Sequence, residues 1–302
     1  MSRAPLEAFA AEVGGPDAGP VVAVGGRTDF DVGGAVAAEA REVRAPVGIV
    51  EHEPAEMTVR VRAGTTVADL DAALAPHRQC VALPDRPGAT VGGVLAVGRS
   101  GLRRLGWGPV RDTVLEVRYV SADGTLVRGG GPTVKNVSGY DLPRLFVGSL
   151  GTLGIIAEVV LRTRPLPACE QWFSGAVDPF RLLHDLHRPA SVLWDGTTTW
   201  VLLEGHPADV AAQARRAALV EVDGPPRYDR LPYRWSMRPT ALATLAADGH
   251  GPFLAEIGVG VVHRAVAPPR PTVDPVVVEL HRRVKQVFDP TGRLAPGRQV
   301  LP

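Results

Sequence analysis

The chain has 302 residues, of which 45% are hydrophobic and 22% charged, and its formal net charge at pH 7 is +1. This length allows two domains, and the near-neutral charge argues against nucleic acid or a membrane surface as the partner. The two cysteines, Cys80 and Cys169, have no ligand spacing, so we expect neither a disulfide framework nor a metal site. No apolar run approaches the roughly 18 residues of a membrane span and no signal peptide is recognisable. We therefore expect a cytoplasmic protein.

The N-terminal half alternates short strands with glycine-rich loops. The apolar run at residues 21–24 stops at two glycines, and residues 57–63 alternate apolar and charged side chains, as strands do. Thr65 or Thr66 can then cap a helix that runs through residues 67–74. The expected strands cover residues 21–24, 57–63, 113–120, 126–127 and 155–163, with a hairpin turn at residues 122–125.

The C-terminal half predicts a strand-rich sheet with helices on one face. Pro165 and Pro167 close the last strand of the first half, which places a domain boundary there. The expected strands are residues 192–193, 200–204 and 252–262, and the expected helices are residues 208–220 and 274–288.

Three glycine clusters stand out, at residues 25–28, 88–93 and 148–154, and residues 88–108 hold seven glycines. Neither a G-x-G-x-x-G motif opening a helix nor a P-loop motif occurs, so a Rossmann or P-loop site is not predicted. Successive backbone N–H groups free of side chains can bind phosphate, with Arg27, Thr28 and Thr90 as further donors. Any one cluster can be a plain tight turn, but three of them favour a nucleotide-type cofactor.

Three sequence blocks resemble the FAD domain of the vanillyl-alcohol-oxidase/PCMH flavoprotein family. They are V-R-D-T-V-L at residues 110–115, V-K-N-V-S-G-Y-D-L-P-R-L at residues 134–145 and G-S-L-G-T-L-G-I-I at residues 148–156. The tail at residues 288–298 is similar to the family's F-D-P-x-G-x-L-N-P-G ending. Within the family, the resemblance is to the FAD-binding subunits of bacterial glycolate oxidases.

The resemblance implies an α+β fold in two domains. Residues 1–166 would form a PCMH-type FAD-binding domain of two subdomains. Residues 167–302 would form a smaller α+β cap domain with an antiparallel sheet and a C-terminal tail that returns to the FAD domain. FAD would be bound non-covalently, because no family histidine is positioned for covalent attachment.

Carried over by position, the implied cofactor-binding residues lie in the glycine clusters and beside them. The pyrophosphate side would comprise Gly25, Gly26, Arg27, Thr28, Asp85, Gly88, Ala89, Thr90, Gly92 and Gly93. The ribityl and flavin side would comprise Gly98, Ser100, Gly101, Trp107 and Gly108. The loop whose backbone faces the flavin or adenine end would comprise Gly148, Gly151, Thr152, Gly154, Ile155 and Ile156.

The chain departs from the family pattern at several places. Arg27 stands where a third glycine is common, and Ala295 replaces the usual asparagine of the tail. The segment before the first glycine loop is short for the family. The H-x-G-D-G-N-x-H motif of the related D-lactate and D-2-hydroxyglutarate dehydrogenases is absent.

Oxidation of a 2-hydroxy acid needs a cation for the carboxylate and a base for the hydroxyl proton, whereas the flavin carries the redox step. The candidate base is His263. The candidate cations are Arg104, Arg111, Lys135, Arg234 and Arg264. Each also has a structural explanation: Arg111 as an ion pair with its neighbour Asp112, for example, and His263 as an exposed strand-end residue.

Three functions follow from the resemblance. The first is an FAD-dependent oxidoreductase that oxidises a 2-hydroxy acid such as glycolate, within a complex containing a second flavin subunit and an iron–sulfur subunit. The second is a non-catalytic or electron-relaying FAD subunit of such a complex. The third is a stand-alone FAD oxidase of another alcohol, because fold alone does not fix the substrate.

Overall fold

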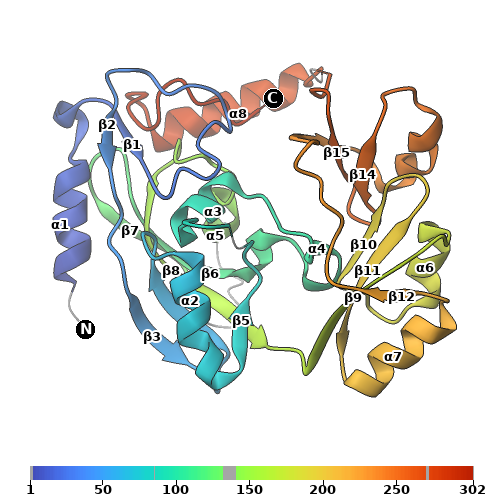
Figure 1. The fold of residues 1–302 in the computed structure, drawn as a ribbon. Coiled ribbons are helices and arrows are strands. Elements are labelled where there is room, and N and C mark those ends of the chain that lie inside the picture. The colour runs from blue at the N-terminus through green and yellow to red at the C-terminus, as the bar shows by residue number, and fades with distance from the viewer. Residues whose placement is uncertain (1–2, 85, 132–140, 270–271, 302) are drawn as a thin grey trace. The chain divides into compact units, whose positions relative to one another are not determined.

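The computed structural model describes residues 3–84, 86–131, 141–269 and 272–301. They form two units (Figure 1). Each unit has a hydrophobic core of its own. Unit 1 comprises Met1–Gly101, Pro109–Pro165 and Pro271–Pro302, and unit 2 comprises Leu102–Gly108 and Leu166–Arg270. The two domains expected from the sequence were residues 1–166 and 167–302. In the structure the segment 102–108 is part of unit 2, and the segment 271–302 is part of unit 1.

Unit 1 is built on an antiparallel sheet with the strand order β3-β4-β8-β6-β7, in which β5 also pairs with β8. A separate parallel pair, β1 and β2, lies next to it in sequence. The strands are β1 (Val21–Ala23), β2 (Arg41–Val43), β3 (Ile49–Glu53), β4 (Thr58–Arg62), β5 (Gln79–Val81), β6 (Val114–Val120), β7 (Leu126–Gly130) and β8 (Ile155–Pro165). The strands predicted in this half are therefore confirmed.

The helices of unit 1 are α1 (Ala4–Val13), α2 (Val67–Leu74), α3 (Val91–Val97), α5 (Leu142–Phe146) and α8 (Pro275–Phe288), with 3-10 turns η1 (Pro16–Ala18), η2 (Ala75–His77) and η3 (Val110–Thr113). Thr66 is the residue that caps α2, since its side chain accepts a hydrogen bond from the backbone N–H of Asp69 at 3.0 Å. No helix among the described residues is both long and apolar enough to span a bilayer.

The two faces of the six-stranded sheet have separate cores. Alternation along β4 sends Val59 and Val61 to one face, where they join a cluster with Leu70 of α2 and Leu95 of α3. On the other face, Phe9 and its neighbours on α1 join a cluster with the ends of β6 and β8. The packing of α2 and α3 on the sheet therefore holds in place the ends of the loops that connect these helices to the strands.

Unit 2 is an antiparallel sheet of seven strands in the order β12-β9-β11-β10-β14-β15-β13 (Figure 1). Its strands are β9 (Cys169–Gly175), β10 (Ser191–Trp194), β11 (Thr199–Gly205), β12 (Val220–Val222), β13 (Tyr233–Ser236), β14 (Phe253–Glu256) and β15 (Val261–Arg264). Its helices are α4 (Arg104–Trp107), α6 (Pro179–Asp185), α7 (Pro207–Arg216) and the 3-10 segment η4 (Pro239–Ala247). The antiparallel α+β architecture agrees with the predicted fold class.

One face of this sheet is covered by α6, α7 and η4, whose Leu182, Val210 and Leu242 share a core with Val201 and Val262. The single strand expected over residues 252–262 is wrong. It is two strands, β14 and β15, because the chain turns at residues 257–260 through two glycines of positive φ. The helix expected to reach residue 220 ends at residue 216, before β12.

Candidate active site

The first two glycine clusters meet in unit 1. A Cβ atom at Gly26 would lie 1.7 Å from the carbonyl oxygen of Gly88, and one at Gly25 would lie 2.2 Å from Oγ1 of Thr90. Thr90 caps α3, accepting from the N–H of Gly93 at 3.2 Å. The loop after β1 therefore touches the backbone of Gly88 and the side chain of Thr90 in the loop before α3, at a distance that only glycine at positions 25 and 26 permits.

A salt-bridge triad around the half-buried Asp29 joins the same loops. The carboxylate of Asp29 accepts from Arg86 at 2.9 and 3.0 Å and from Arg99 at 3.1 Å. Asp29 follows the first glycine cluster, Arg86 precedes the second, and Arg99 lies in the segment 98–101. One carboxylate thus ties three loops together, and its side chain is only 17% exposed.

The segments 98–101 and 148–154 are the next neighbours. The N–H of Gly148 donates to the carbonyl of Leu95 at 2.9 Å, and the backbone of Gly148 lies 2.8 Å from where a Cβ of Gly98 would be. Gly148 and Gly151 have φ of +84° and +75°, and a Cβ added at either would meet nothing within 4 Å. These turns thus present open backbone, as a cofactor-binding loop requires.

Other residues of the implied set shape the loops rather than face outward. The hydroxyl of Thr152 donates to the carbonyl of Ser149 at 2.7 Å, and Oγ of Ser100 accepts from the N–H of Val110 at 3.0 Å. The side chains of Ile155 and Ile156 are buried in the two cores of unit 1.

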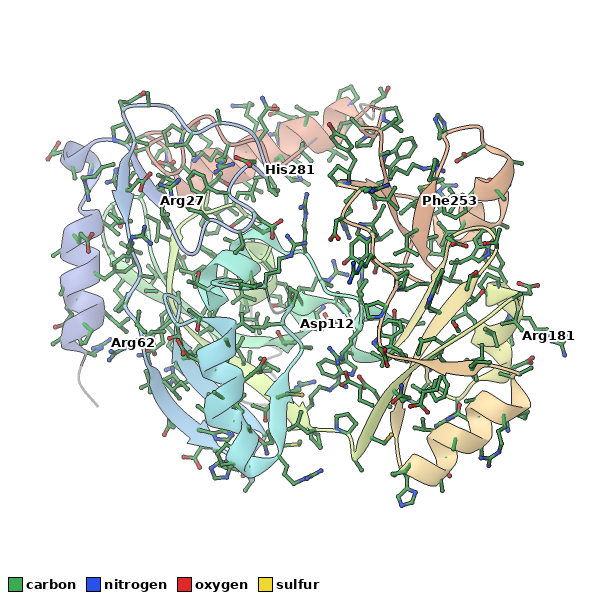
Figure 2. All side chains as sticks on the ribbon, in the orientation of Figure 1. Arg27, Arg62, Asp112, Arg181, Phe253 and His281 are labelled. Carbon is green, nitrogen blue, oxygen red and sulfur yellow. The ribbon has the colours of Figure 1, made fainter. Side chains whose placement is uncertain are left out.

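Arg27 occupies the family's third glycine position in a glycine-like conformation. Its φ is +58°, in the left-handed region, so the turn is kept although the side chain is charged. The guanidinium forms an ion pair with Glu42 and lies 4.7 Å from the ring centre of Phe30 (Arg27 is labelled in Figure 2). Ala295 likewise has φ +45°, a conformation that the family's asparagine adopts more easily.

Gly92 has a packing role. A Cβ there would lie 2.7 Å from Cβ of Ala63 and 3.0 Å from its carbonyl oxygen, and the N–H of Gly92 donates to that oxygen at 2.8 Å. The helix α3 thus rests directly on the end of β4. Gly92 is therefore needed for the close packing of the helix on the strand. The sequence had predicted only a contact with the pyrophosphate for this residue.

Trp107 and Gly108 belong to unit 2, in the segment 102–108. The indole N–H of Trp107 donates to Oε2 of Glu204 at 2.7 Å, and Nε of Arg103 donates to Oε1 of the same carboxylate at 3.0 Å. Arg103 also pairs with Glu170. Burial alone would lower the pKa of Arg103, but the hydrogen bonds and charges of these two carboxylates outweigh it and raise the pKa.

The candidate substrate residues on β13 and β15 lie on opposite faces of the sheet of unit 2. Arg234 of β13 lies directly opposite His263 of β15 in the antiparallel register, so both side chains stand on the sheet face away from the core of unit 2. Arg264 faces the other way: it is fully buried, pairs with Asp248 and stacks on Phe253, which Figure 2 labels. It is therefore a structural cation.

The remaining candidates are placed as follows. Arg104 lies on α4 of unit 2, and Arg111 is 62% exposed and 4.0 Å from Asp112, the neighbour-pair explanation expected from sequence. Lys135 and Asp85 lie outside the described residues.

Sequence reasoning missed the carboxylates that organise these groups: Asp29, Glu204 and Glu256. Glu256 accepts a hydrogen bond from His263 at 3.0 Å although it stands in the apolar stretch F-L-A-E-I. A lone acid in an apolar strand is a signal that could have found it, because a buried carboxylate needs a partner. The partners of Asp29 lie 57 and 70 residues away in sequence and leave no local pattern.

Comparison with protein families assigns this architecture to flavoproteins. Residues 17–130 match the family of FAD binding domains, and residues 211–299 match the C-terminal domain of FAD linked oxidases. The chain therefore carries matches to both domains of FAD-linked oxidases, which supports FAD as its cofactor. The fold agrees: an alkyldihydroxyacetonephosphate synthase superposes with a TM-score of 0.70 over 96% of this chain and 74% of its own, at 14% sequence identity.

Among individual relatives, the glycolate oxidase subunit GlcE of Escherichia coli is 33% identical over 220 residues, 69% of this chain and 62% of GlcE. A D-lactate dehydrogenase of Archaeoglobus fulgidus is 40% identical over 48% of this chain and 33% of its own. The glycolate oxidase subunit GlcD of Bacillus subtilis is 31% identical over 59% and 40%. The chain is thus homologous to FAD-linked oxidoreductases of 2-hydroxy acids, and it spans less than two thirds of each of these relatives.

The loops of unit 1 fit a dinucleotide. Gly88, Gly148 and Gly151 all have positive φ and open space where a side chain would be, and Gly25 and Gly26 allow two of the loops to approach. Bare N–H groups of this kind bind phosphate and the edges of rings. The residues that would hold FAD are therefore those of the segments 25–28, 88–93, 98–101 and 148–154.

Proposed function

We propose that this chain is an FAD-carrying oxidoreductase subunit that oxidises a small 2-hydroxy acid of the glycolate or D-lactate type. The single observation that carries the proposal is the meeting of four glycine-rich segments in unit 1, in a chain whose relatives are named for glycolate and D-lactate. When bound, FAD supplies the acceptor for two electrons and a hydrogen.

The substrate side of the proposal rests on Arg104, Arg234 and His263 of unit 2 and on Lys135, which lies outside the described residues. A 2-hydroxy acid carries a carboxylate, for which Arg234 is the proposed cation, with Arg104 and Lys135 as further candidates. His263 is the proposed base for the hydroxyl proton. A guanidinium binds a carboxylate through two parallel hydrogen bonds, which fixes the orientation of a ligand as small as glycolate.

The experiment is anaerobic reduction of the purified yellow protein. Bleaching of the flavin absorbance by glycolate or D-lactate, and not by glucose or a simple primary alcohol, is the expected result. Arg234→Met should raise the KM for the acid about tenfold or more, because the carboxylate loses its charge-assisted bonds. Flavin that no 2-hydroxy acid reduces would refute this function.

A second candidate is an electron-relaying FAD subunit whose substrate is oxidised on a partner. The observation that favours it is the absence from the sequence of the H-x-G-D-G-N-x-H motif of the related D-lactate dehydrogenases. The relatives GlcE and GlcD are named as subunits, so we propose a heteromeric oxidase with a second flavin subunit and an iron–sulfur subunit in the cytoplasm. Co-purification with its genomic neighbours tests the assembly. Bleaching by the acid only after the partner is added would favour the relay.

A further inference from the structure

A histidine–glutamate pair stands on the sheet face of unit 2 that faces away from its core. Along β15, Val262 points into the core and His263 points away from it, and along β14 Ala255 and Glu256 alternate in the same way. Nε2 of His263 lies 3.0 Å from Oε1 of Glu256. The two side chains are 14% and 7% exposed, so the hydrogen bond is largely shielded from water.

The chemistry of the two groups fixes which one donates. An ionised carboxylate can only accept, so the imidazole must carry its proton on Nε2. In the neutral ring, Nδ1 then holds the free lone pair. The ring of Tyr228 packs on the imidazole with centroids 4.8 Å apart and planes at 48°, which limits rotation about the hydrogen bond. The ring is thus held in one tautomer and one orientation.

We propose that Glu256 is a positioning residue for the oxidation, fixing His263 so that Nδ1 accepts the hydroxyl proton of a 2-hydroxy monocarboxylate. This inference rests on the proposed function. Arg234, opposite His263 across the β13–β15 pair, would bind the carboxylate of the same substrate. The substrate's hydroxyl and carboxylate sit on adjacent carbons, which suits a base and a cation on paired positions of adjacent strands.

The step balances with FAD as the oxidant. The O–H bond would break with its proton going to Nδ1 of His263, while the C–H bond would break with its hydrogen and both electrons going to FAD, the oxidant that the segments 25–28, 88–93, 98–101 and 148–154 would hold. A C=O bond forms, so the 2-hydroxy acid becomes a 2-oxo acid. The imidazolium that results keeps its Nε2–H on the carboxylate of Glu256, which stabilises the new positive charge.

A purely structural pair would hold the sheet together without affecting turnover, so the test must separate these roles. Glu256→Gln keeps the shape of the side chain and removes its charge. We expect kcat for the acid to fall about 10- to 100-fold, as when the group that orients a functional histidine is removed, with KM changed less than about threefold. His263→Gln should lower kcat at least as much. The matched control is Glu221→Gln on the exposed strand β12, which should leave kcat, KM and flavin content unchanged.

A readout independent of turnover accompanies the kinetics. In protein labelled with ¹⁵N-histidine, the shielded Nε2–H of His263 should give a slowly exchanging imidazole proton signal. It should be lost in His263→Gln, kept in Glu221→Gln, and shifted or broadened in Glu256→Gln. Thermal unfolding and flavin stoichiometry of each variant show whether the fold is retained, and Glu256→Asp should recover part of kcat if it is.

The outcomes separate the two claims. If the acid reduces the flavin but Glu256→Gln turns over as fast as the wild type, the positioning role is refuted and the proposed function stands. If no 2-hydroxy acid reduces the flavin, the function itself fails, and with it this role, whatever the imidazole signal shows. A folded Glu256→Gln with normal flavin content, low kcat and little changed KM supports both.

Discussion

Nη2 of Arg293 donates to the backbone carbonyl oxygen of Val13 at 2.8 Å, joining residues 280 positions apart in the sequence. The same guanidinium donates to the carbonyls of Gly14, Gly19 and Ala122 at 3.0, 2.9 and 3.2 Å. Arg293 is 4% exposed, and burial lowers its pKa. One buried cation therefore satisfies four carbonyl groups and ties the C-terminal tail to the N-terminal segment of unit 1.

We predict that Arg293→Ala destabilises unit 1 by about 3 kcal/mol or more, because it leaves several buried carbonyls without donors. Arg293→Lys should be intermediate, since an ammonium cannot reach four acceptors in a planar array. Urea unfolding of the purified chain measures both. Equal stability of the lysine variant and the wild type would mean that the charge matters and the fork of donors does not.

Two glycines of the cofactor loops should respond differently to substitution. Gly92→Ala brings Cβ within 2.7 Å of Ala63, so we expect overpacking to cost about 1–3 kcal/mol of stability whether or not FAD is present. Gly151→Leu projects into open space, so we expect loss of FAD with only backbone strain of about 1 kcal/mol added. The flavin absorbance of each purified variant and urea unfolding report the two effects.

Gly292→Leu is the matched control for strain, because Gly292 has φ +70° and open space like Gly151 and lies outside the glycine loops. It should retain FAD. If Gly151→Leu also kept stoichiometric flavin, the loop 148–154 would not touch the cofactor.

Substitutions of Arg27 separate charge from backbone geometry. Arg27→Gly removes the guanidinium but adopts φ +58° freely, whereas Arg27→Val also lacks the charge and resists that conformation. We expect the glycine variant to bind FAD within a few-fold of the wild type and the valine variant at least tenfold more weakly. Fluorescence titration of the apoprotein with FAD measures both. Equal losses would show that the positive charge, not the turn, is what the cofactor needs.

The elements that the sequence predicted are those with a strong local signal. Alternation marks β4, glycines mark the end of β1, and Asp274 followed by Pro275 marks the start of α8, where Asp274 accepts from the N–H of Val276 at 2.8 Å. The three-residue strands β2 and β12 were missed, because so short a segment owes its conformation to its neighbours in the sheet.

The position of the glycine loops was likewise predictable from the sequence, whereas the contacts between distant residues were not. Glycine density located the loops, and their side-by-side arrangement followed from the resemblance. The allocation of residues 102–108 to unit 2 could not be foreseen, since it depends on bonds from Arg103 and Trp107 to Glu204, about a hundred residues later. The same holds for the buried orientation of Arg264, which neighbours His263 but points to the other face of the strand.

A buried charge network crosses the six-stranded sheet of unit 1. Glu116 is fully buried, with Arg60 at 2.8 Å, Arg128 at 2.7 Å and Arg118 at 3.4 Å. Burial alone would lower the pKa of Arg60, but Glu116 and Glu158 outweigh it and raise the pKa.

We predict that Glu116→Ala lowers the free energy of unfolding by about 3–5 kcal/mol, because three arginines lose a shared carboxylate. Glu51→Ala, whose carboxylate is 41% exposed and 3.7 Å from Arg60, should cost less than about 1 kcal/mol. Denaturant unfolding that ranks the two variants equally would refute this reading of the network.

The carboxylate of Glu204 should control the mobility of the segment 102–108. Glu204→Ala removes the acceptor of both Arg103 and Trp107 and leaves Arg103 with Glu170 alone. We expect backbone amides of this segment to exchange with deuterium at least tenfold faster, while those of β11 change little, because its ladder to β9 and β10 is intact. Hydrogen–deuterium exchange by mass spectrometry measures this, with Glu221→Ala as the control of equal charge change on β12.

Since the segment follows Gly98–Gly101 directly, we also expect Glu204→Ala to bind FAD more weakly. Unchanged exchange would mean that the N–H of Gly106, which donates to Ala190 at 3.2 Å, suffices to hold the segment.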